Sequence, residues 1–274
     1  MAKRPFAQVD VFADRPQRGN PVAVVLDAGG VGDAALARFA AWTNLSETTF
    51  VLPPTHEDAD YRVRIFTPTV ELPFAGHPTL GTCHAWLEAQ GAGHEGDTIV
   101  QECDAGLVPI RRTGDGLAFA APPLLRGGPV EESLVAELAE AMRVDRDDVI
   151  DAQWADNGPG WVALMLGSAQ AVLDVRPGYI EMDVGLVGMH PDGSPEVRAF
   201  FPKDGVLMED PVTGSLNASL AQWLLGDGRL EAPFVARQGA AVGRDGRVHV
   251  SRDDHGTIWV GGQTVTCISG SVEL

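Results

Sequence analysis

Long apolar runs and lysine are both scarce in this chain of 274 residues. None of its apolar runs approaches the roughly 18 residues that a membrane-spanning helix needs. The first residues, MAKRPFAQVDVF, hold no apolar segment of the kind found in a signal peptide. Its lysines are Lys3 and Lys203, so almost all of its positive charge comes from arginine. We therefore expect neither a membrane span nor a secretory signal.

Cysteine is also rare, and its pattern excludes two kinds of stabilising site. Cys83, Cys103 and Cys267 are odd in number, and none of them forms a C-x-x-C pair. A disulfide framework and a structural zinc site are therefore not expected. A reducing cytoplasm is the predicted location.

Positive charge is outweighed by negative charge. Lys and Arg total 20 against 38 Asp and Glu, which gives a formal net charge of -18. A surface of this sign repels nucleic acid and anionic lipid, so neither is an expected partner. Hydrophobic residues make up 45% and charged residues 21%, as in a globular protein, and the length suits one large domain or two small ones.

Two motifs occur twice, in the same order. The pattern V-R-x-F-x-P occupies residues 63–68 and 197–202, starting points that lie 134 residues apart. The pattern E-x-P-x-x-G occupies residues 71–76 and 209–214, starting points that lie 138 residues apart. Both separations are close to half the chain, and each second motif leads into a helix-like stretch. We interpret this as a duplication; the alternative is two independent strand–turn–helix units built from common residue types.

Strands outnumber helices in the predicted secondary structure, and the two do not alternate one for one, which indicates an α+β fold. Strands are expected at residues 6–12, 21–26, 48–52, 61–66, 98–102, 107–112, 117–120, 161–166, 184–189, 197–201, 234–238, 248–251, 257–260 and 264–268. Helices are expected at residues 34–42, 78–90, 133–142 and 215–225, with Asp33 and Ser133 as the caps of the first and third.

The helical stretches 80–87 and 216–225 are apolar on nearly every side. Such a helix must be buried, so each half is expected to wrap a mostly antiparallel sheet around a central helix. The Pro- and Gly-rich stretch 121–129 is the expected linker. The sequence thus predicts two pseudo-symmetric domains at 1–125 and 126–274, with the last strand able to join the first domain.

The repeated turn places a glycine at the start of each central helix, Gly76 in one half and Gly214 in the other. The first N–H groups of a helix have no partner within it and carry partial positive charge. Two such helix starts, related by a pseudo-two-fold axis, would face each other across a cleft and favour a small carboxylate ligand. The alternative is ordinary helix entry, with Thr79 and Ser215 as caps.

Three ionisable residues beside these turns are candidates for chemistry. His77 could orient a substrate or move a proton, or it could serve only as a structural hydrogen-bonding residue. His77 and His84 could both bind a metal ion, but the sequence offers no third ligand, so no metal site is expected. Asp210 could form the turn or bind an amino or hydroxyl group of a substrate. Glu47 enters a strand beside Phe50, where partial desolvation would raise its pKa, although a solvated turn residue is also possible there.

The same places carry a family resemblance. The segments S-E-T-T-F-V (46–51), F-A-G-H-P-T-L-G (74–81) and E-D-P-V-T-G-S (209–215) resemble the phenazine-biosynthesis PhzF-like isomerase family, a relative of diaminopimelate epimerase. Residues 9–12 and 19–24 resemble its opening strands, and its closing strands resemble residues 238–239, 243–244 and 260–262. The resemblance runs from about residue 8 to the C-terminus.

This resemblance implies a two-domain fold with an active site in the interdomain cleft, and a homodimeric isomerase without a cofactor. The named member of the family moves a double bond in a dihydro-hydroxyanthranilate. By position in the family motifs, the catalytic acid/base is Glu47, and the residues expected to bind the substrate are Gly76, His77, Asp210, Gly214 and Ser215.

Two other functions stay open at this stage. The epimerase relatives use two cysteines as base and acid, and the corresponding positions here hold Ala75 and Pro211, which disfavours a two-thiol epimerase. A non-catalytic protein that binds small acids is the other alternative. The substrate itself is not specified by the resemblance.

Overall fold

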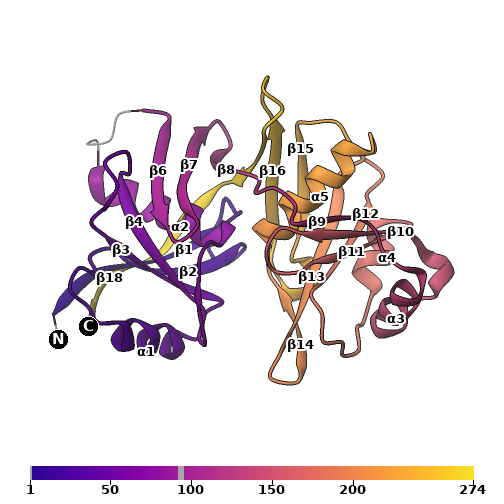
Figure 1. Cartoon of the computed structure of the whole chain (residues 1–274), viewed down its shortest axis with the longest axis horizontal. Helices are drawn as coiled ribbons and strands as arrows, with labels where there is room; N and C mark the ends of the chain where they lie inside the picture. Colours follow the sequence, from indigo (N-terminus) through magenta and orange to yellow (C-terminus); the bar gives the residue numbers. More distant parts are fainter. Residues whose placement is uncertain (1, 92–95) are drawn as a thin grey trace. The chain divides into compact units, whose positions relative to one another are not determined.

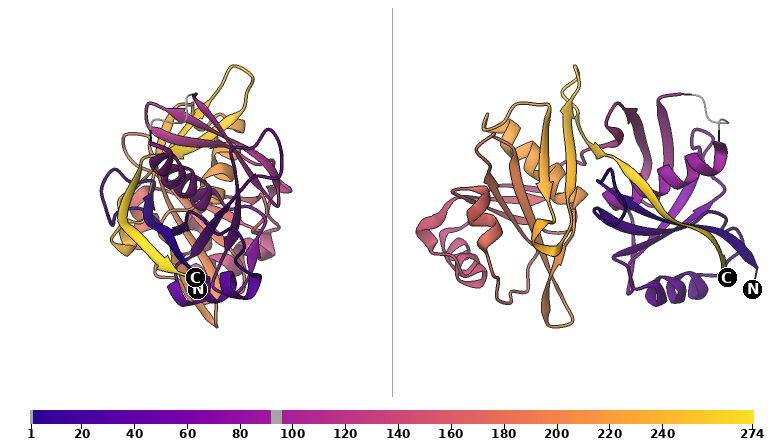
Figure 2. Two further views of the ribbon diagram at one scale, coloured as in Figure 1. Left: turned by 90° about the vertical axis from the view of Figure 1, so that its left-hand side faces the viewer. Right: turned by 180° about the vertical axis from the view of Figure 1, so that it is seen from behind.

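A computed structural model describes residues 2–91 and 96–274, and the fold consists of two units. Residue 1 and residues 92–95, which fall within the predicted first domain, lie outside the described residues. Unit 1 contains residues 1–120 and 261–274, and unit 2 contains residues 121–260. The boundary at 120/121 lies near the predicted one at 125/126, and the last strand, β18, pairs along its length with β1 of unit 1, as the prediction allowed (Figures 1 and 2).

Unit 1 consists of strands wrapped around one helix, with a second helix outside them. Its elements are β1 (Lys3–Val11), β2 (Asn20–Val25), α1 (Asp33–Thr43), β3 (Glu47–Leu52), β4 (Tyr61–Phe66), β5 (Glu71–Leu72), α2 (Gly76–Gln90), β6 (Thr98–Cys103), β7 (Gly106–Thr113), β8 (Gly116–Ala120) and β18 (Thr264–Glu273). The central helix α2 contacts β1, β2, β3, β6, β8 and β18.

Unit 2 follows the same plan around α5. Its elements are β9 (Arg126–Pro129), α3 (Glu132–Met142), a 3₁₀ turn (Arg146–Asp148), β10 (Val149–Asp156), β11 (Val162–Leu166), α4 (Ala169–Asp174), β12 (Val184–Met189), β13 (Pro195–Lys203), β14 (Val206–Asp210), α5 (Gly214–Gly226), β15 (Phe234–Gln238), a 3₁₀ turn (Ala240–Val242), β16 (Gly246–Arg252) and β17 (Ile258–Gly262), which spans the boundary. The predicted α+β class is confirmed.

The order of strand pairing is the same in both units. In unit 1 the pairs β1–β2, β3–β4 and β4–β5 are antiparallel, whereas β2–β3 and β4–β6 are parallel. In unit 2 the pairs β10–β11, β12–β13 and β13–β14 are antiparallel, whereas β11–β12 and β13–β15 are parallel. The matching order supports the duplication inferred from the repeated motifs.

Glycine lets each central helix lie close to its sheet. A Cβ atom added to Gly81 of α2 would lie 2.3 Å from Val22 Cγ1 of β2. A Cβ atom added to Gly185 of β12 would lie 2.5 Å from Leu216 Cδ1 of α5. Because both distances are far below van der Waals contact, the close packing of these helices requires glycine.

The repeated motifs form the same contacts in both units. In unit 1, Arg64 of V-R-x-F-x-P donates from Nε and Nη2 to Glu71 of E-x-P-x-x-G, at 2.6 and 2.7 Å. In unit 2, Arg198 donates in the same two-pronged manner to Glu209, at 3.0 and 2.7 Å. Each arginine also lies over the ring of the motif phenylalanine. The two motifs of each unit are therefore joined by one ion pair.

Three local predictions were wrong. The N-cap of α1 is Gly32, and Asp33 is its first residue, where the carboxylate accepts from Arg64 instead of capping the helix. The N-cap of α3 is Glu131 rather than Ser133, and its side chain forms no capping hydrogen bond. The expected linker is partly a strand, since β9 pairs with β10.

Candidate active site

Glu47 and His77 lie side by side in unit 1. Glu47 is the first residue of β3, and His77 is the second residue of α2. Glu47 Oε2 lies 3.3 Å from His77 Nε2, and the two side chains are only 16% and 7% exposed. Glu47, the candidate base, is therefore largely removed from water and contacts His77, the histidine expected to bind the substrate.

The imidazole of His77 is held from its other side by the start of β2. The Asn20 amide Nδ2 lies 3.4 Å from His77 Nδ1, and Asn20 is fully buried. The buried Asp10 carboxylate accepts from the backbone N–H groups of Arg18 and Gly19, which fixes the loop that leads to Asn20. Sequence reasoning assigned no role to these two residues, although both belong to the segments that resembled the family's opening strands.

Burial lowers the pKa of His77 to about 3, and a hydrogen bond with the Pro21 backbone offsets only part of this effect. The imidazole is therefore neutral near pH 7. A neutral imidazole can donate from one nitrogen and accept at the other. Nε2 is the nitrogen that faces Glu47, so the contact fits an ionised carboxylate when Nε2 carries the hydrogen and a protonated carboxyl group when Nε2 is the acceptor.

Acid should destabilise the protein through His77. The imidazole takes up a proton at its ordinary pKa of about 6.5 when unfolded, but only near pH 3 when folded. The free energy of unfolding should therefore fall as the pH drops below about 6.5, with a contribution of up to about 1.4 kcal/mol per pH unit. In urea titrations between pH 7.5 and 4.5, His77→Gln should show a shallower fall. The exposed His255→Gln is the control; equal slopes for the parent and His77→Gln would contradict this origin.

The helix start beside this pair offers backbone groups to a ligand. Helix α2 begins at Gly76 after the extended residue Ala75, and its N-cap forms no side-chain hydrogen bond. Residues 76–79 are all buried. The first N–H groups of a helix carry partial positive charge, so binding of an anionic group at this start stays a prediction.

The second motif builds a similar start in unit 2. Asp210 ends β14, and its carboxylate Oδ2 accepts from Thr213 Oγ1 at 2.5 Å. Helix α5 then begins at Gly214, and its N-cap Thr213 makes no side-chain capping bond. Ser215 Oγ accepts from Trp161 Nε1 at 3.0 Å, which leaves the serine hydroxyl hydrogen to donate elsewhere. Asn157 Nδ2 donates to the Ser215 carbonyl at 2.9 Å.

The structure thus brings Glu47, His77 and Gly76 together in unit 1. In unit 2 it brings together Asp210, Gly214 and Ser215. That these two groups face one ligand stays a prediction.

Thiol chemistry is poorly supported by the cysteines. Cys83 is buried in α2, where desolvation raises its pKa to about 12. Desolvation also raises the pKa of Cys103. A thiol that stays protonated near pH 7 is a poor base and a poor nucleophile. This agrees with the sequence argument against a two-thiol epimerase.

No helix within residues 2–91 and 96–274 is long and apolar enough to cross a membrane.

Comparisons with known proteins agree with this architecture. Antisense-enhancing sequence 1 of Schizosaccharomyces pombe is 35% identical, over 98% of this chain and 99% of the relative. The trans-2,3-dihydro-3-hydroxyanthranilate isomerase of Pseudomonas aeruginosa is 33% identical, over 92% of this chain and 91% of the relative.

The fold is shared with solved structures. A phenazine biosynthesis protein of the PhzF family from Bacillus anthracis superposes with a TM-score of 0.84 over 100% of both chains, at 23% identity. Epimerases also share the fold, which confirms the predicted epimerase-like architecture. The family model of phenazine biosynthesis-like proteins matches residues 9–270. The chain therefore belongs to the phenazine biosynthesis-like protein family, and it is an isomerase of the PhzF-like type.

Proposed function

We propose that this isomerase moves a proton, and with it a double bond, within a small cyclic amino- or hydroxy-carboxylate, without a cofactor. Glu47 is the proposed acid/base. The observation that carries the proposal is the Glu47 carboxyl group, largely buried, at 3.3 Å from the imidazole of His77. The name of the Pseudomonas aeruginosa relative supports a substrate resembling trans-2,3-dihydro-3-hydroxyanthranilate.

The proposed reaction needs only proton transfer. The Glu47 carboxylate takes a proton from one ring carbon, so that a C–H bond breaks and an O–H bond forms while the ring electrons shift. The protonated Glu47 then returns the proton to another ring carbon. Substrate and product have the same atoms and the same oxidation state, so no oxidant or reductant takes part.

The other site residues have proposed binding roles. Neutral His77 keeps the Glu47 carboxyl group oriented in both protonation states. Asp210 binds the amino or hydroxyl group of the substrate. The helix starts at Gly76 and Gly214, together with the Ser215 hydroxyl, bind its carboxylate. A homodimeric assembly and a cytoplasmic location stay predictions.

Incubation in D₂O should reveal the chemistry. With trans-2,3-dihydro-3-hydroxyanthranilate and related cyclic acids, we expect the ultraviolet spectrum to change as the double bond moves. Mass spectrometry should show deuterium on carbon where Glu47 exchanges its proton with solvent. Heat-denatured protein is the control. Saturable binding with neither a spectral change nor deuterium uptake would instead favour the non-catalytic acid-binding protein, and inversion without double-bond movement would favour an epimerase.

A further inference from the structure

Gln238 is a buried residue with no assigned role, and its side chain bonds to the turn that carries Asp210 and to α5. It is the last residue of β15 and is 1% exposed. Its Oε1 accepts from Thr213 N at 3.0 Å and from Asn217 Nδ2 at 2.8 Å. Its Nε2 donates to the Asp210 carbonyl at 3.2 Å and to Thr213 Oγ1 at 2.9 Å. The amide thus uses two acceptor and two donor positions.

The orientation of this amide follows from its partners. The backbone N–H of Thr213 can only donate, so the atom that faces it must be the oxygen Oε1. Nε2 therefore faces the Asp210 carbonyl and the Thr213 hydroxyl. Because Thr213 Oγ1 in turn donates to Asp210 Oδ2 at 2.5 Å, Gln238 is linked to both the main chain and the carboxylate of Asp210.

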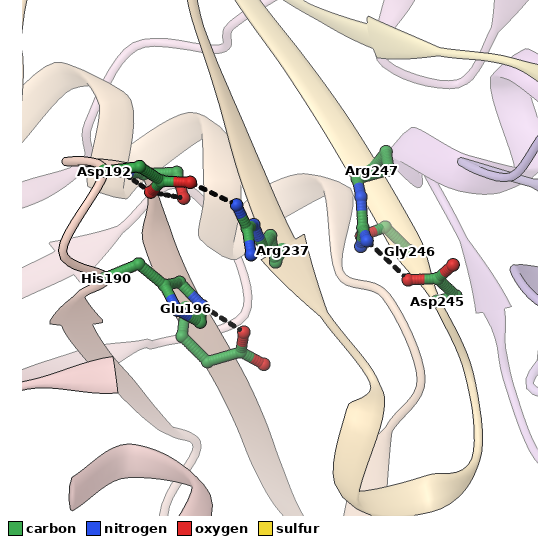
Figure 3. Close-up of polar contacts among 8 residues, drawn as sticks. His190, Asp192, Glu196, Arg237, Asp245, Gly246 and Arg247 are labelled. Carbon is green, nitrogen blue, oxygen red and sulfur yellow. Dashed lines mark hydrogen bonds and ion pairs between the residues drawn. The ribbon is translucent and has the colours of Figure 1, made fainter. Parts of the chain in front are cut away.

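Contacts of Arg237, the residue before Gln238 on β15, hold this strand against β13. Parallel pairing between β13 and β15 places Glu196 opposite Arg237 and Val197 opposite Gln238. Figure 3 shows Arg237 reaching Asp192, in the hairpin before β13, while His190 of the same hairpin contacts Glu196. Burial raises the pKa of the Glu196 carboxyl group, and the His190 contact of 2.9 Å offsets part of this rise. These contacts restrict movement of β15 along β13.

Unit 1 contains a counterpart with different partners. Gln101 lies 137 residues before Gln238, half the length of the chain, and is also fully buried on a strand parallel to the V-R-x-F-x-P strand. Its Nε2 donates to Thr79 Oγ1, and its Oε1 accepts from Tyr61. Thr79 is the fourth residue of α2, as Asn217 is of α5. The duplicated glutamine holds the central helix in both units, whereas in unit 2 it also bonds to the turn.

We infer that Gln238 is a positioning residue of the isomerase, which sets the orientation of Asp210 and of the start of α5 toward the substrate. The inference rests on the proposed function, because Asp210 is taken there as a substrate contact. Without Gln238, the Asp210–Thr213 turn would lose three hydrogen bonds to a single side chain, and Asn217 of α5 would lose one. The substrate would then meet an Asp210 carboxylate with more freedom to rotate.

Gln238→Met is the principal test, since methionine has a similar shape and lacks the amide. Asp210 and the helix start should bind the substrate and the transition state alike, so we expect KM to rise by about tenfold or more while kcat changes by less than about threefold. The dissociation constant of anthranilate, used as a binding probe, should rise in parallel. Gln222→Met is the control, because it removes an amide of α5 that donates to the Pro122 carbonyl and contacts neither the turn nor a helix start. Its KM should stay within about threefold of the parent.

Gln238→Glu gives a signature that loss of stability alone would not produce. The new carboxyl group can still accept hydrogen bonds as Gln238 Oε1 does, and while it is protonated its O–H can donate one hydrogen bond in place of Nε2. On ionisation it loses that donor and places a negative charge beside the Asp210 carbonyl. We therefore expect KM relative to the parent to be near normal at low pH and to rise as the new group ionises. A pH-independent KM ratio would contradict the inference.

A ligand-independent measurement completes the test. Hydrogen exchange followed by NMR should show the Thr213 amide losing protection in Gln238→Met while amides in the middle of α5 keep theirs, because Thr213 N donates to the missing oxygen. Unchanged Thr213 protection, or a lower thermal stability with unchanged KM and anthranilate binding, would overturn the inference. Turnover that survives Glu47→Gln would instead refute the proposed acid/base and leave these binding results unaffected.

Discussion

Glu47→Gln is expected to abolish turnover while ligand binding is retained. Glutamine keeps the size of the side chain and can keep its contact with His77, whose Nε2 lies 3.3 Å from the native carboxyl oxygen. It cannot accept and return a proton as a carboxylate does. General acid–base assistance is worth about 10² to 10⁴ in rate, so kcat should fall by at least this factor if Glu47 is the sole proton carrier. The measurements are kcat, deuterium uptake and the dissociation constant of anthranilate on one preparation.

A second carboxylate in the same unit serves as the control. Glu88 lies near the end of α2, and its side chain is 53% exposed, so Glu88→Gln removes one negative charge without touching the Glu47–His77 contact. It should leave kcat within about threefold of the parent. Activity of Glu47→Gln within a few-fold of the parent would refute the assignment. Equal losses in both variants would point to the net charge rather than to proton transfer.

The repeated motifs made the architecture predictable. A helix that is apolar on nearly every side must be enclosed, and the sequence showed two of these, each after the same pair of motifs. The caps were less predictable, because Asp33 and Ser133 fit the composition of an N-cap while the chain enters those helices one or two residues earlier. The sequence left the placement of β18 open between the two units, because its pairing with β1 joins the two ends of the chain and local pattern does not specify it.

The site was predictable to the extent that its residues lie in motifs. Glu47, His77 and Asp210 stood out because each is ionisable beside a turn. Asn20 and Gln238 lie in segments that resembled the family, but neither is ionisable, and their contacts with His77 and Asp210 join residues distant in sequence. Buried amides of this kind look like ordinary strand residues until their hydrogen bonds are known.

Arg198→Met is expected to cause a large loss of stability. Arg198 is 4% exposed, and it donates to the Val172 and Val175 carbonyls as well as to Glu209. Removal of the guanidinium would leave the Glu209 carboxylate, only 11% exposed, without its principal counter-charge. Breaking a buried ion pair on one side costs about 3–5 kcal/mol, which urea denaturation would measure as a lower midpoint with an unchanged slope.

The equivalent arginine of unit 1 provides a matched comparison. Arg64 pairs with Glu71 in the same geometry, but their side chains are 19% and 30% exposed, so water can replace part of the lost interaction. Arg64→Met should therefore cost about 1 kcal/mol, close to the range of exposed ion pairs. Adding Glu209→Leu to Arg198→Met should recover stability, because no buried carboxylate is then left unpaired. Equal losses for the two single variants, or no recovery in the double variant, would show that burial of Glu209 is not the cause.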